Sequence, residues 1–180
     1  MVGEVWLMIN IRKGTFETNS SSTHSLVVFK ESNAAADNQL WRLNDDGVLE
    51  IFNVSDLEFG RAPFELLTDW YRRLCYAIAS CPDRIEEIEA ACYRNLPGLT
   101  AIMYPTRRWH QDIGEPYYGY VDHQSAGLLE SFLKKHNISF DEFIFDNKYM
   151  VVIDGDEYCV FNTLRQTPAW NKDNVEEVYD

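Results

Sequence analysis

The order of apolar and polar residues along the chain predicts strands towards both ends and helices in the middle. Short apolar runs rich in β-branched and aromatic residues are typical of strands. Such runs lie at residues 5–11, 25–29, 99–104, 149–153 and 158–161. Asp45-Asp46-Gly47 and Asp154-Gly155-Asp156-Glu157 each separate two β-prone runs, and turn residues of this kind predict hairpins.

Between these strands, apolar residues recur at steps of three and four, which predicts a helix over residues 63–80. Pro82 suits the first turn of a second helix that ends near Asn95. Ser139 with Glu142 three residues later fits a capping box for a short helix. The charged residues of the two longer helices are expected on solvated faces, in mutual charge pairs. These residues are Arg72, Arg73, Arg84, Arg94, Glu86, Glu87 and Glu89.

Ser125 is the predicted cap of one further helix, which ends near His136. Strands, then helices, then strands predict an α+β fold with a largely antiparallel sheet and helices in the middle of the chain. The length of the chain, 180 residues, favours a single domain over residues 1–180. Residues 171–180 are expected to form an acidic tail or a short terminal helix.

The chain is strongly acidic, because 29 Asp and Glu against 16 Lys and Arg give a net charge of −13. A protein that neutralises phosphates needs a basic surface, so this charge argues against general DNA or RNA binding and permits a basic partner. The alternative is that the negative charge only aids solubility. Residues 1–70 and 141–180 hold the excess, so the two flanks would form one acidic face if they meet in the fold.

The sequence has no glycine fingerprint for a dinucleotide, no phosphate loop and no Cys-x-x-Cys pair, and we expect neither a cofactor nor a metal. No apolar run reaches the length of a membrane span, and the first residues lack the pattern of a secretory signal. The sequence therefore predicts a soluble protein of the reducing cytoplasm.

The most distinctive segment is a polar stretch over residues 12–25. Hydroxyls and free backbone amides can cradle an anion, and an arginine can add a two-point contact to a carboxylate or phosphate. If the stretch is extended, Ser22 and His24 share one face, where the imidazole can act as acid or base near neutral pH. The alternative is a connecting loop whose side chains bond their own backbone. The candidate ligand or anion loop consists of Arg12, Asn19, Ser20, Ser21, Ser22, Thr23 and His24.

The string R-x-G-x-F-E-T-N-S-S-S-T-H-S at residues 12–25 resembles the N-terminal signature of small proteins encoded by phages and mobile elements of gut and related bacteria. In similar proteins the motif lies almost at the start, which makes Met8 an alternative to Met1 as initiator. The resemblance implies a phage setting, in which small acidic proteins include inhibitors of host defence nucleases, among them anti-CRISPR proteins. Some of these inhibitors present carboxylates where a nuclease expects phosphates.

Residues 157–161, Glu-Tyr-Cys-Val-Phe, look like the late Glu-Tyr-x-Val-[Tyr/Phe] strand of ADP-ribosyltransferases. The resemblance implies that Glu157 stabilises a developing ribosyl cation or polarises a nucleophile. The Ser-Thr-Ser strand that normally accompanies this motif is replaced by Ser-Thr-His-Ser at residues 22–25. A plain hairpin with a charged turn is the alternative.

The segment over residues 105–124 is irregular in pattern and combines arginines with aromatic residues. Tyr, Trp and Arg dominate the hot spots of protein interfaces, so this segment is a candidate partner-binding surface. It could instead stack a nucleotide base or pack onto the core. The candidate partner-binding residues here and in the C-terminal hairpin are Arg107, Arg108, Trp109, Tyr117, Tyr118, Asp154, Asp156 and Glu157.

These features favour a binding protein over an enzyme. We expect a phage or mobile-element accessory protein that binds and inhibits a host protein in the bacterial cytoplasm through acidic and aromatic surfaces. A basic nucleic-acid enzyme, such as a defence nuclease, is the expected partner. The alternative is a small nucleotide-using enzyme, for example one like an ADP-ribosyltransferase, in which Ser22, His24 and Glu157 would be catalytic.

Overall fold

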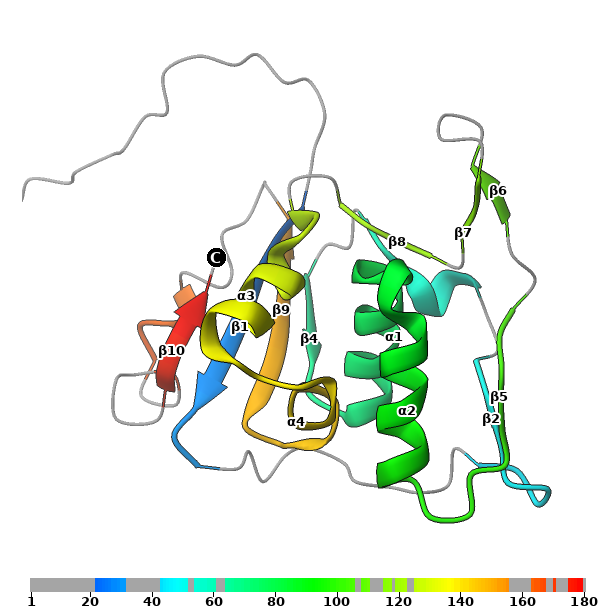
Figure 1. Ribbon diagram of the computed structural model, residues 1–180. Helices are drawn as coiled ribbons and strands as arrows, with labels where there is room; N and C mark the ends of the chain where they lie inside the picture. Colours follow the sequence, from blue (N-terminus) through cyan, green and yellow to red (C-terminus); the bar gives the residue numbers. More distant parts are fainter. Residues whose placement is uncertain are drawn as a thin grey trace, which may run out of the picture.

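The central sheet of the molecule has four strands in the order β10-β1-β9-β4, all antiparallel to their neighbours (Figure 1). The strand β1 (Ser22–Phe29) lies between β9 (Tyr149–Gly155) and β10 (Val175–Tyr179), and β4 (Phe64–Leu67) completes the sheet beside β9. The two flanks of the sequence therefore meet in one sheet.

The computed structural model describes residues 22–31, 43–51, 54–60, 64–105, 108–110, 115–117, 119–122, 125–155, 163–167, 170 and 175–179. The expected strands at residues 5–11 and 158–161 lie outside these residues. No helix among the described residues is both long enough and apolar enough to cross a membrane.

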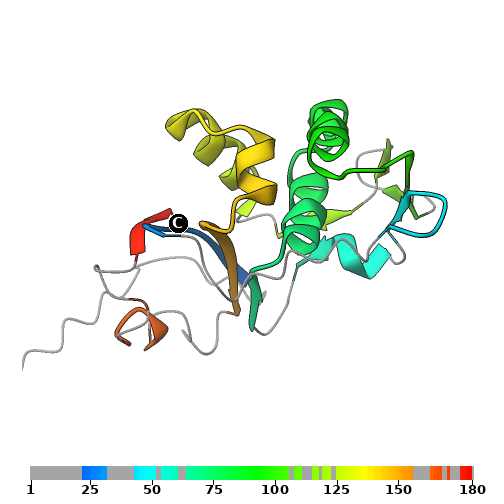
Figure 2. The ribbon, with the colours of Figure 1, turned by 90° about the horizontal axis from the view of Figure 1, so that it is seen from below.

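The helices gather on one side of the sheet (Figure 2). α1 (Trp70–Ser80) packs against α3 (Leu128–His136) and α4 (Phe140–Phe145), and α3 contacts β1. α2 (Ile85–Asn95) packs against α1 and α4. This arrangement confirms the α+β prediction, with an antiparallel sheet as the largest one and helices in the middle of the chain.

Successive side chains of a strand point to opposite faces of a sheet, and both faces of this sheet are apolar. Leu26, Val151 and Ile153 belong to the main core beneath the helices. On the opposite face, Val27 and Val152 form part of a smaller cluster, packed with Met150, Phe29, Phe64, Leu164, Trp170 and Val175. A strand buried on both faces is apolar without interruption, as residues 26–29 and 149–153 are.

Shorter pairings complete the described structure. β2 (Val48–Glu50) pairs in parallel with β5 (Ala101–Met103), and β3 (Glu58–Phe59) pairs in parallel with β8 (Tyr120–Val121). β6 (Arg108–His110) and β7 (Glu115–Tyr117) form an antiparallel pair in the segment expected to be irregular. Two 3-10 helices are η1 (Val54–Leu57) and η2 (Pro82–Arg84).

The predicted helix over residues 63–80 is wrong in its first part. Residues 64–67 form β4, and the helix begins at Trp70. Asp69 marks the boundary, because its side chain accepts a hydrogen bond from the Arg72 backbone N–H over 2.9 Å and so caps α1. An apolar spacing of three residues between Phe64 and Leu67 fits a helix, but the two side chains pack in clusters on opposite faces of the sheet.

Ser125 was predicted to cap α3, and this prediction is wrong. Gly127, with a left-handed backbone at φ 77°, precedes the helix, and the Ser125 hydroxyl accepts a hydrogen bond from the His24 backbone N–H. The capping box of Ser139 and Glu142 is present and begins α4 as predicted. The turn at residues 45–47 also forms. Leu43 bridges to Leu49 across it, and β2 pairs with β5.

Two predictions at the ends of the sheet are wrong. Residues 175–179 form the edge strand β10 instead of an acidic tail or a helix, because Val175 and Tyr179 pack against the two apolar clusters. Residues 22–24 belong to β1 instead of a loop, because β9 supplies them with antiparallel partners. The sequence rules missed both because the pairing strands lie far away along the chain.

Candidate functional site

Ser22, Thr23 and His24, the end of the predicted anion loop, form the first residues of β1. The chain is extended at these residues, which is the conformation that the predicted pairing of Ser22 with His24 requires. Arg12, Asn19, Ser20 and Ser21 lie outside the described residues.

His24 lies in a buried polar cluster between the sheet and the helices, where it is 2% exposed. Its imidazole Nδ1 is 3.1 Å from the hydroxyl of Tyr76 on α1, with which it shares a hydrogen bond. Its backbone N–H donates to Ser125 Oγ over 3.2 Å. The ring of Tyr76 also meets Phe59 edge-on, with 5.2 Å between centroids. The cluster therefore joins β1 to α1 and to the segment before α3.

Burial lowers the pKa of His24 from its ordinary 6.5 to about 4, and the nearby buried carboxylate of Asp122 opposes this shift. Burial also raises the pKa of the Tyr76 phenol. His24 is therefore neutral at pH 7, unlike the group titrating near neutral pH that the sequence led us to expect. A buried neutral imidazole of this kind holds its neighbours in place.

Asp154, expected in an exposed turn, instead lies in β9 opposite Thr23 and Phe64, and it is 8% exposed. It therefore does not belong to an exposed acidic surface. Asp156 and Glu157 of the same predicted turn lie outside the described residues.

Part of the predicted aromatic surface lies in the paired strands β6 and β7. Arg108 and Trp109 lie in β6, and Tyr117 lies in β7 opposite Arg108. Arg107 and Tyr118 lie outside the described residues. The three placed residues thus lie on one short hairpin.

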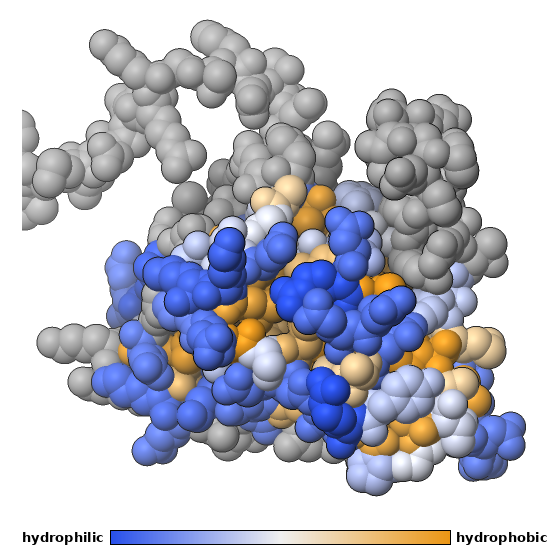
Figure 3. Space-filling view, viewed as in Figure 1, coloured by the Kyte–Doolittle hydropathy of each residue, from blue (hydrophilic) through white to orange (hydrophobic). Residues whose placement is uncertain are grey.

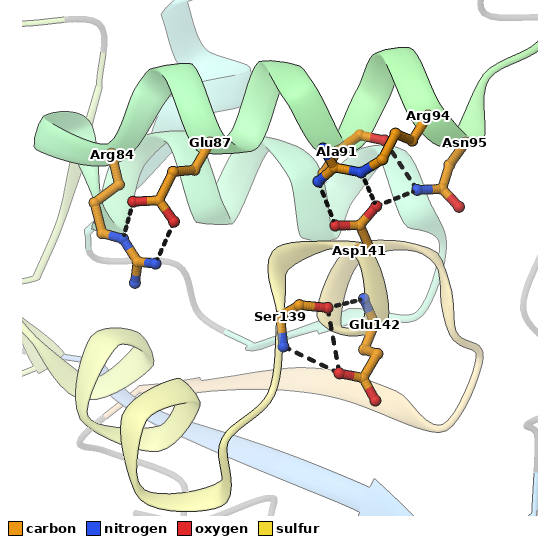
Figure 4. A network of polar contacts seen from close by, with 8 residues as sticks. All are labelled: Arg84, Glu87, Ala91, Arg94, Asn95, Ser139, Asp141 and Glu142. Carbon is orange, nitrogen blue, oxygen red and sulfur yellow. Dashed lines mark hydrogen bonds and ion pairs between the residues drawn. The ribbon is translucent and has the colours of Figure 1, made fainter.

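A charged network connects α2 with α4 on the exposed side of the helical layer (Figure 4). The Arg94 guanidinium makes a two-point contact with the Asp141 carboxylate, at 2.9 Å from Nε and 2.6 Å from Nη2. Asn95 Nδ2 donates to the same carboxylate over 2.8 Å. The hydrogen bond from Arg94 lowers the pKa of Asp141. The network thus links α4 to the C-terminal end of α2 at the surface.

At the N-terminal end of α2, Arg84 makes a similar two-point contact with Glu87, at 2.9 and 2.6 Å (Figure 4). The Arg84 guanidinium also lies over the Phe140 ring, 4.6 Å from its centroid. Both arginines of α2 and η2 are therefore already paired with carboxylates. Their positive charge is largely offset before any partner approaches.

The outer helical layer, which consists of η2, α2 and α4, keeps an excess of negative charge. Residues 82–95 and 139–146 contain seven acidic and two basic side chains, a net charge of −5. Asp83, Glu86, Glu87 and Glu142 are exposed, and we call the surface around them the acidic helical face. The exposed ring of Tyr93 lies on the same helix, α2. Carboxylates from the middle of the sequence and from its C-terminal flank therefore share one exposed layer.

The sequence interpretation treated these carboxylates only as solvated helix faces and so missed them as a candidate surface. The local signal was an acidic excess over residues 82–95, hidden because residues 71–140 as a whole are balanced. It also placed Arg73 on a solvated face, which is wrong, since Arg73 is fully buried. Arg73 lies beside Trp70 and Leu74 on the apolar side of α1, and this position was the available signal of its burial.

In the part of the chain that the structure describes, His, Cys, Asp and Glu side chains do not gather in threes that could hold a metal ion. Comparisons of the chain with protein-family models, with curated proteins and with solved structures give no match.

Proposed function

We propose that this chain is a phage or mobile-element accessory protein of the bacterial cytoplasm that binds and inhibits a host protein through its acidic helical face. The observation that carries the proposal is the pairing of Arg84 and Arg94 with Glu87 and Asp141, which leaves this layer with exposed, uncompensated carboxylates. A basic surface attracts such an array over several ångströms.

The partner that suits this surface is a nucleic-acid enzyme whose binding groove is lined by lysine and arginine, such as a defence nuclease. Carboxylates placed at such a groove compete with phosphates for the same cations. The resemblance of residues 12–25 to phage proteins supports the same setting. Direct binding of nucleic acid does not fit a net charge of −13.

The test is capture of host proteins from a bacterial lysate on the tagged full chain, at about 50 mM and about 500 mM salt. We expect a basic nucleic-acid enzyme that is retained at low salt, released at high salt and displaced by added DNA. Addition of the purified chain should then inhibit that enzyme.

A pair of matched double variants makes the test specific. Asp83→Lys with Glu86→Lys should abolish capture, since it reverses charge on the acidic helical face. Asp45→Lys with Glu176→Lys changes the net charge equally at exposed positions elsewhere and should preserve capture. Equal loss in both double variants, or failure to retain a basic protein at either salt concentration, would contradict the proposal.

A further inference from the structure

A groove with a volume of about 520 Å³ lies beside the acidic helical face, between η2, α3 and the segment that joins α3 to α4. In the space-filling view, hydrophobic residues are visible between the hydrophilic residues of α3 and those of α2 (Figure 3). The apolar part of the lining comes from Leu133 and Ile138. The polar part comes from Arg84, Glu130, Lys134, Asn137 and Ser139.

One side of α3 supplies most of this lining. Glu130, Leu133, Lys134 and Asn137 recur at steps of three and four, so they lie along a single helix stripe. Leu133 is 3% exposed and belongs to the main core, so it is a fixed apolar floor. Glu130 is exposed at the rim. The groove therefore combines a rigid apolar base with an accessible carboxylate.

The opposite wall is held in place by Arg84. Its guanidinium is bound by Glu87 at two points and lies over the Phe140 ring. Because Glu87 already matches its charge, Arg84 shapes the wall of the groove and attracts an anion only weakly.

Among the residues that the structure describes, Glu130 has no such fixed partner. A glutamate four residues before a lysine commonly forms an ion pair on a helix, and Lys134 stands at that spacing. No ion pair reaches Glu130 or Lys134 among the residues that the structure describes. The Glu130 carboxylate is thus available to a cation from outside.

Further carboxylates converge near the same place. Burial raises the pKa of the Cys81 thiol to about 12, with added contributions from Glu130, Glu87 and Asp83 and an opposing one from Arg84. These three carboxylates come from α3, α2 and η2, and all act on one thiol. The lining itself holds Glu130, Arg84 and Lys134, and Glu87 offsets the charge of Arg84. Asp83, next to Arg84, and Glu142, whose carboxylate lies at Ser139 Oγ, add two carboxylates beside the lining, so the local charge favours a cation.

We propose that this groove receives an arginine side chain of the partner protein, with its apolar stem against Leu133 and Ile138 and its guanidinium at the Glu130 carboxylate. Long basic side chains bury their stems on apolar surface while the charged end stays accessible. Arginine fits a carboxylate at two points and is common among interface anchors. The inference rests on the proposed function and names the group by which the basic partner is anchored.

The probe is N-acetyl-arginine amide, which carries one positive charge, titrated into the isotopically labelled full chain and followed by backbone amide NMR. N-acetyl-citrulline amide has nearly the same shape without the charge and serves as the matched ligand. We expect saturable shifts of the Leu133, Lys134, Asn137 and Ile138 amides at millimolar concentrations with the arginine derivative, and much weaker ones with citrulline. Weak affinity is expected because one side chain replaces a whole interface.

Three variants at exposed positions sharpen the titration. Glu130→Gln should weaken binding by about tenfold, since it removes the charge-assisted contact. Lys134→Gln should tighten binding by about twofold, because a like charge leaves the rim. Glu176→Gln removes a carboxylate from β10 and should leave the affinity unchanged.

Equal shifts with the arginine and citrulline derivatives, or an affinity of Glu130→Gln within twofold of the original chain, would overturn the groove assignment. Capture of host protein by Glu130→Gln separates this outcome from the proposed function. If host protein is captured equally by both chains and the titration fails, the groove assignment alone is wrong. If the arginine derivative binds at Glu130 and no host protein is captured, the inhibitor proposal is wrong while the groove stands.

Discussion

Arg73 and Arg94 lie on neighbouring helices and have opposite surroundings. Arg73 is fully buried, and its guanidinium donates to the backbone carbonyls of Ile144, Tyr149 and Thr68. Arg94 has a side chain that is 59% exposed and pairs with the carboxylate of Asp141. One arginine joins the end of α4 and the start of β9 to α1, whereas the other lies on the surface.

The difference separates polar groups that maintain the fold from polar groups that a partner can reach. A buried donor stabilises because its removal leaves acceptors without water or a partner. An exposed ion pair exchanges with water and salt, so its loss has little effect on folding. We therefore expect substitutions at Arg73 and His24 to change stability, and substitutions on the acidic helical face to change binding.

The largest effect is expected for Arg73→Met, which keeps most of the volume and removes every hydrogen bond of the guanidinium. The carbonyls of Ile144 and Tyr149 then lose their buried donor, and the free energy of unfolding should fall by about 3 to 5 kcal/mol. Urea unfolding followed by circular dichroism measures the change. Arg73→Lys should recover only part of it, because an ammonium cannot reproduce the planar fork. An unchanged urea midpoint in Arg73→Met would remove the contrast with Arg94.

The next effect is a dependence of stability on pH through His24. Above pH 6.5 the imidazole is neutral in both states, whereas between pH 6.5 and pH 4 mainly the unfolded chain takes up the proton. This group should therefore reduce stability as the pH falls through that window, by about 1.4 kcal/mol per pH unit and up to about 3 kcal/mol. His24→Gln keeps a polar side chain and cannot titrate. As the pH is lowered from 6.5 to 4, the free energy of unfolding of this variant should fall less than that of the original chain. Parallel plots of unfolding free energy against pH for the two proteins would contradict the effect of burial on His24.

A smaller effect tests whether every surface contact is dispensable. Ser139 lies on the exposed side, yet its hydroxyl accepts the Glu142 backbone N–H and begins α4. Ser139→Ala should lower the free energy of unfolding by about 1 kcal/mol, because a helix N-terminus loses its cap. Ser131→Ala removes an exposed hydroxyl within α3 and is the matched control. Equal urea midpoints for the two variants would show that the cap has no role.

The smallest effect on folding is expected for Arg94→Gln, which leaves the urea midpoint unchanged within experimental scatter. The same substitution removes the charged partner of the Asp141 carboxylate, which keeps its hydrogen bond from Asn95, and makes the acidic helical face more negative. Capture of the host protein should then persist to higher salt than with the original chain. Earlier release would mean that Arg94 itself contacts the partner.

Elements with strong local signals were predictable from the sequence. Pro82 and the box of Ser139 with Glu142 predicted the starts of two helical segments close to where they occur. The prediction for residues 64–67 failed because apolar residues three positions apart fit a helix. Only pairing with β9 makes the segment a strand. The prediction for residues 175–179 failed for the same reason, since Val-Glu-Glu-Val-Tyr lacks the alternation of a strand and its partner is the distant β1.

The candidate site was less predictable than the fold. Asp141 and Arg94 are 47 residues apart in the sequence, and no local rule connects them. Asp154 looked like an exposed turn residue, because its neighbours are Gly and acidic residues, but the strand continues through it. Arg73 was wrongly predicted on a solvated face, although its place between Trp70 and Leu74 on the apolar side of α1 is a signal of burial with backbone partners.

The position of β1 at the centre of the sheet affects how the chain folds during synthesis. Leu26 pairs with both Val151 and Tyr179, so neither neighbour of this strand exists when the strand itself leaves the ribosome. A long stretch of chain must close before β1 gains its hydrogen bonds, and sheets of such distant pairings fold slowly. Until then β1 remains an open apolar strand that other chains can pair with. Loss of residues 175–179 would make that exposed edge permanent.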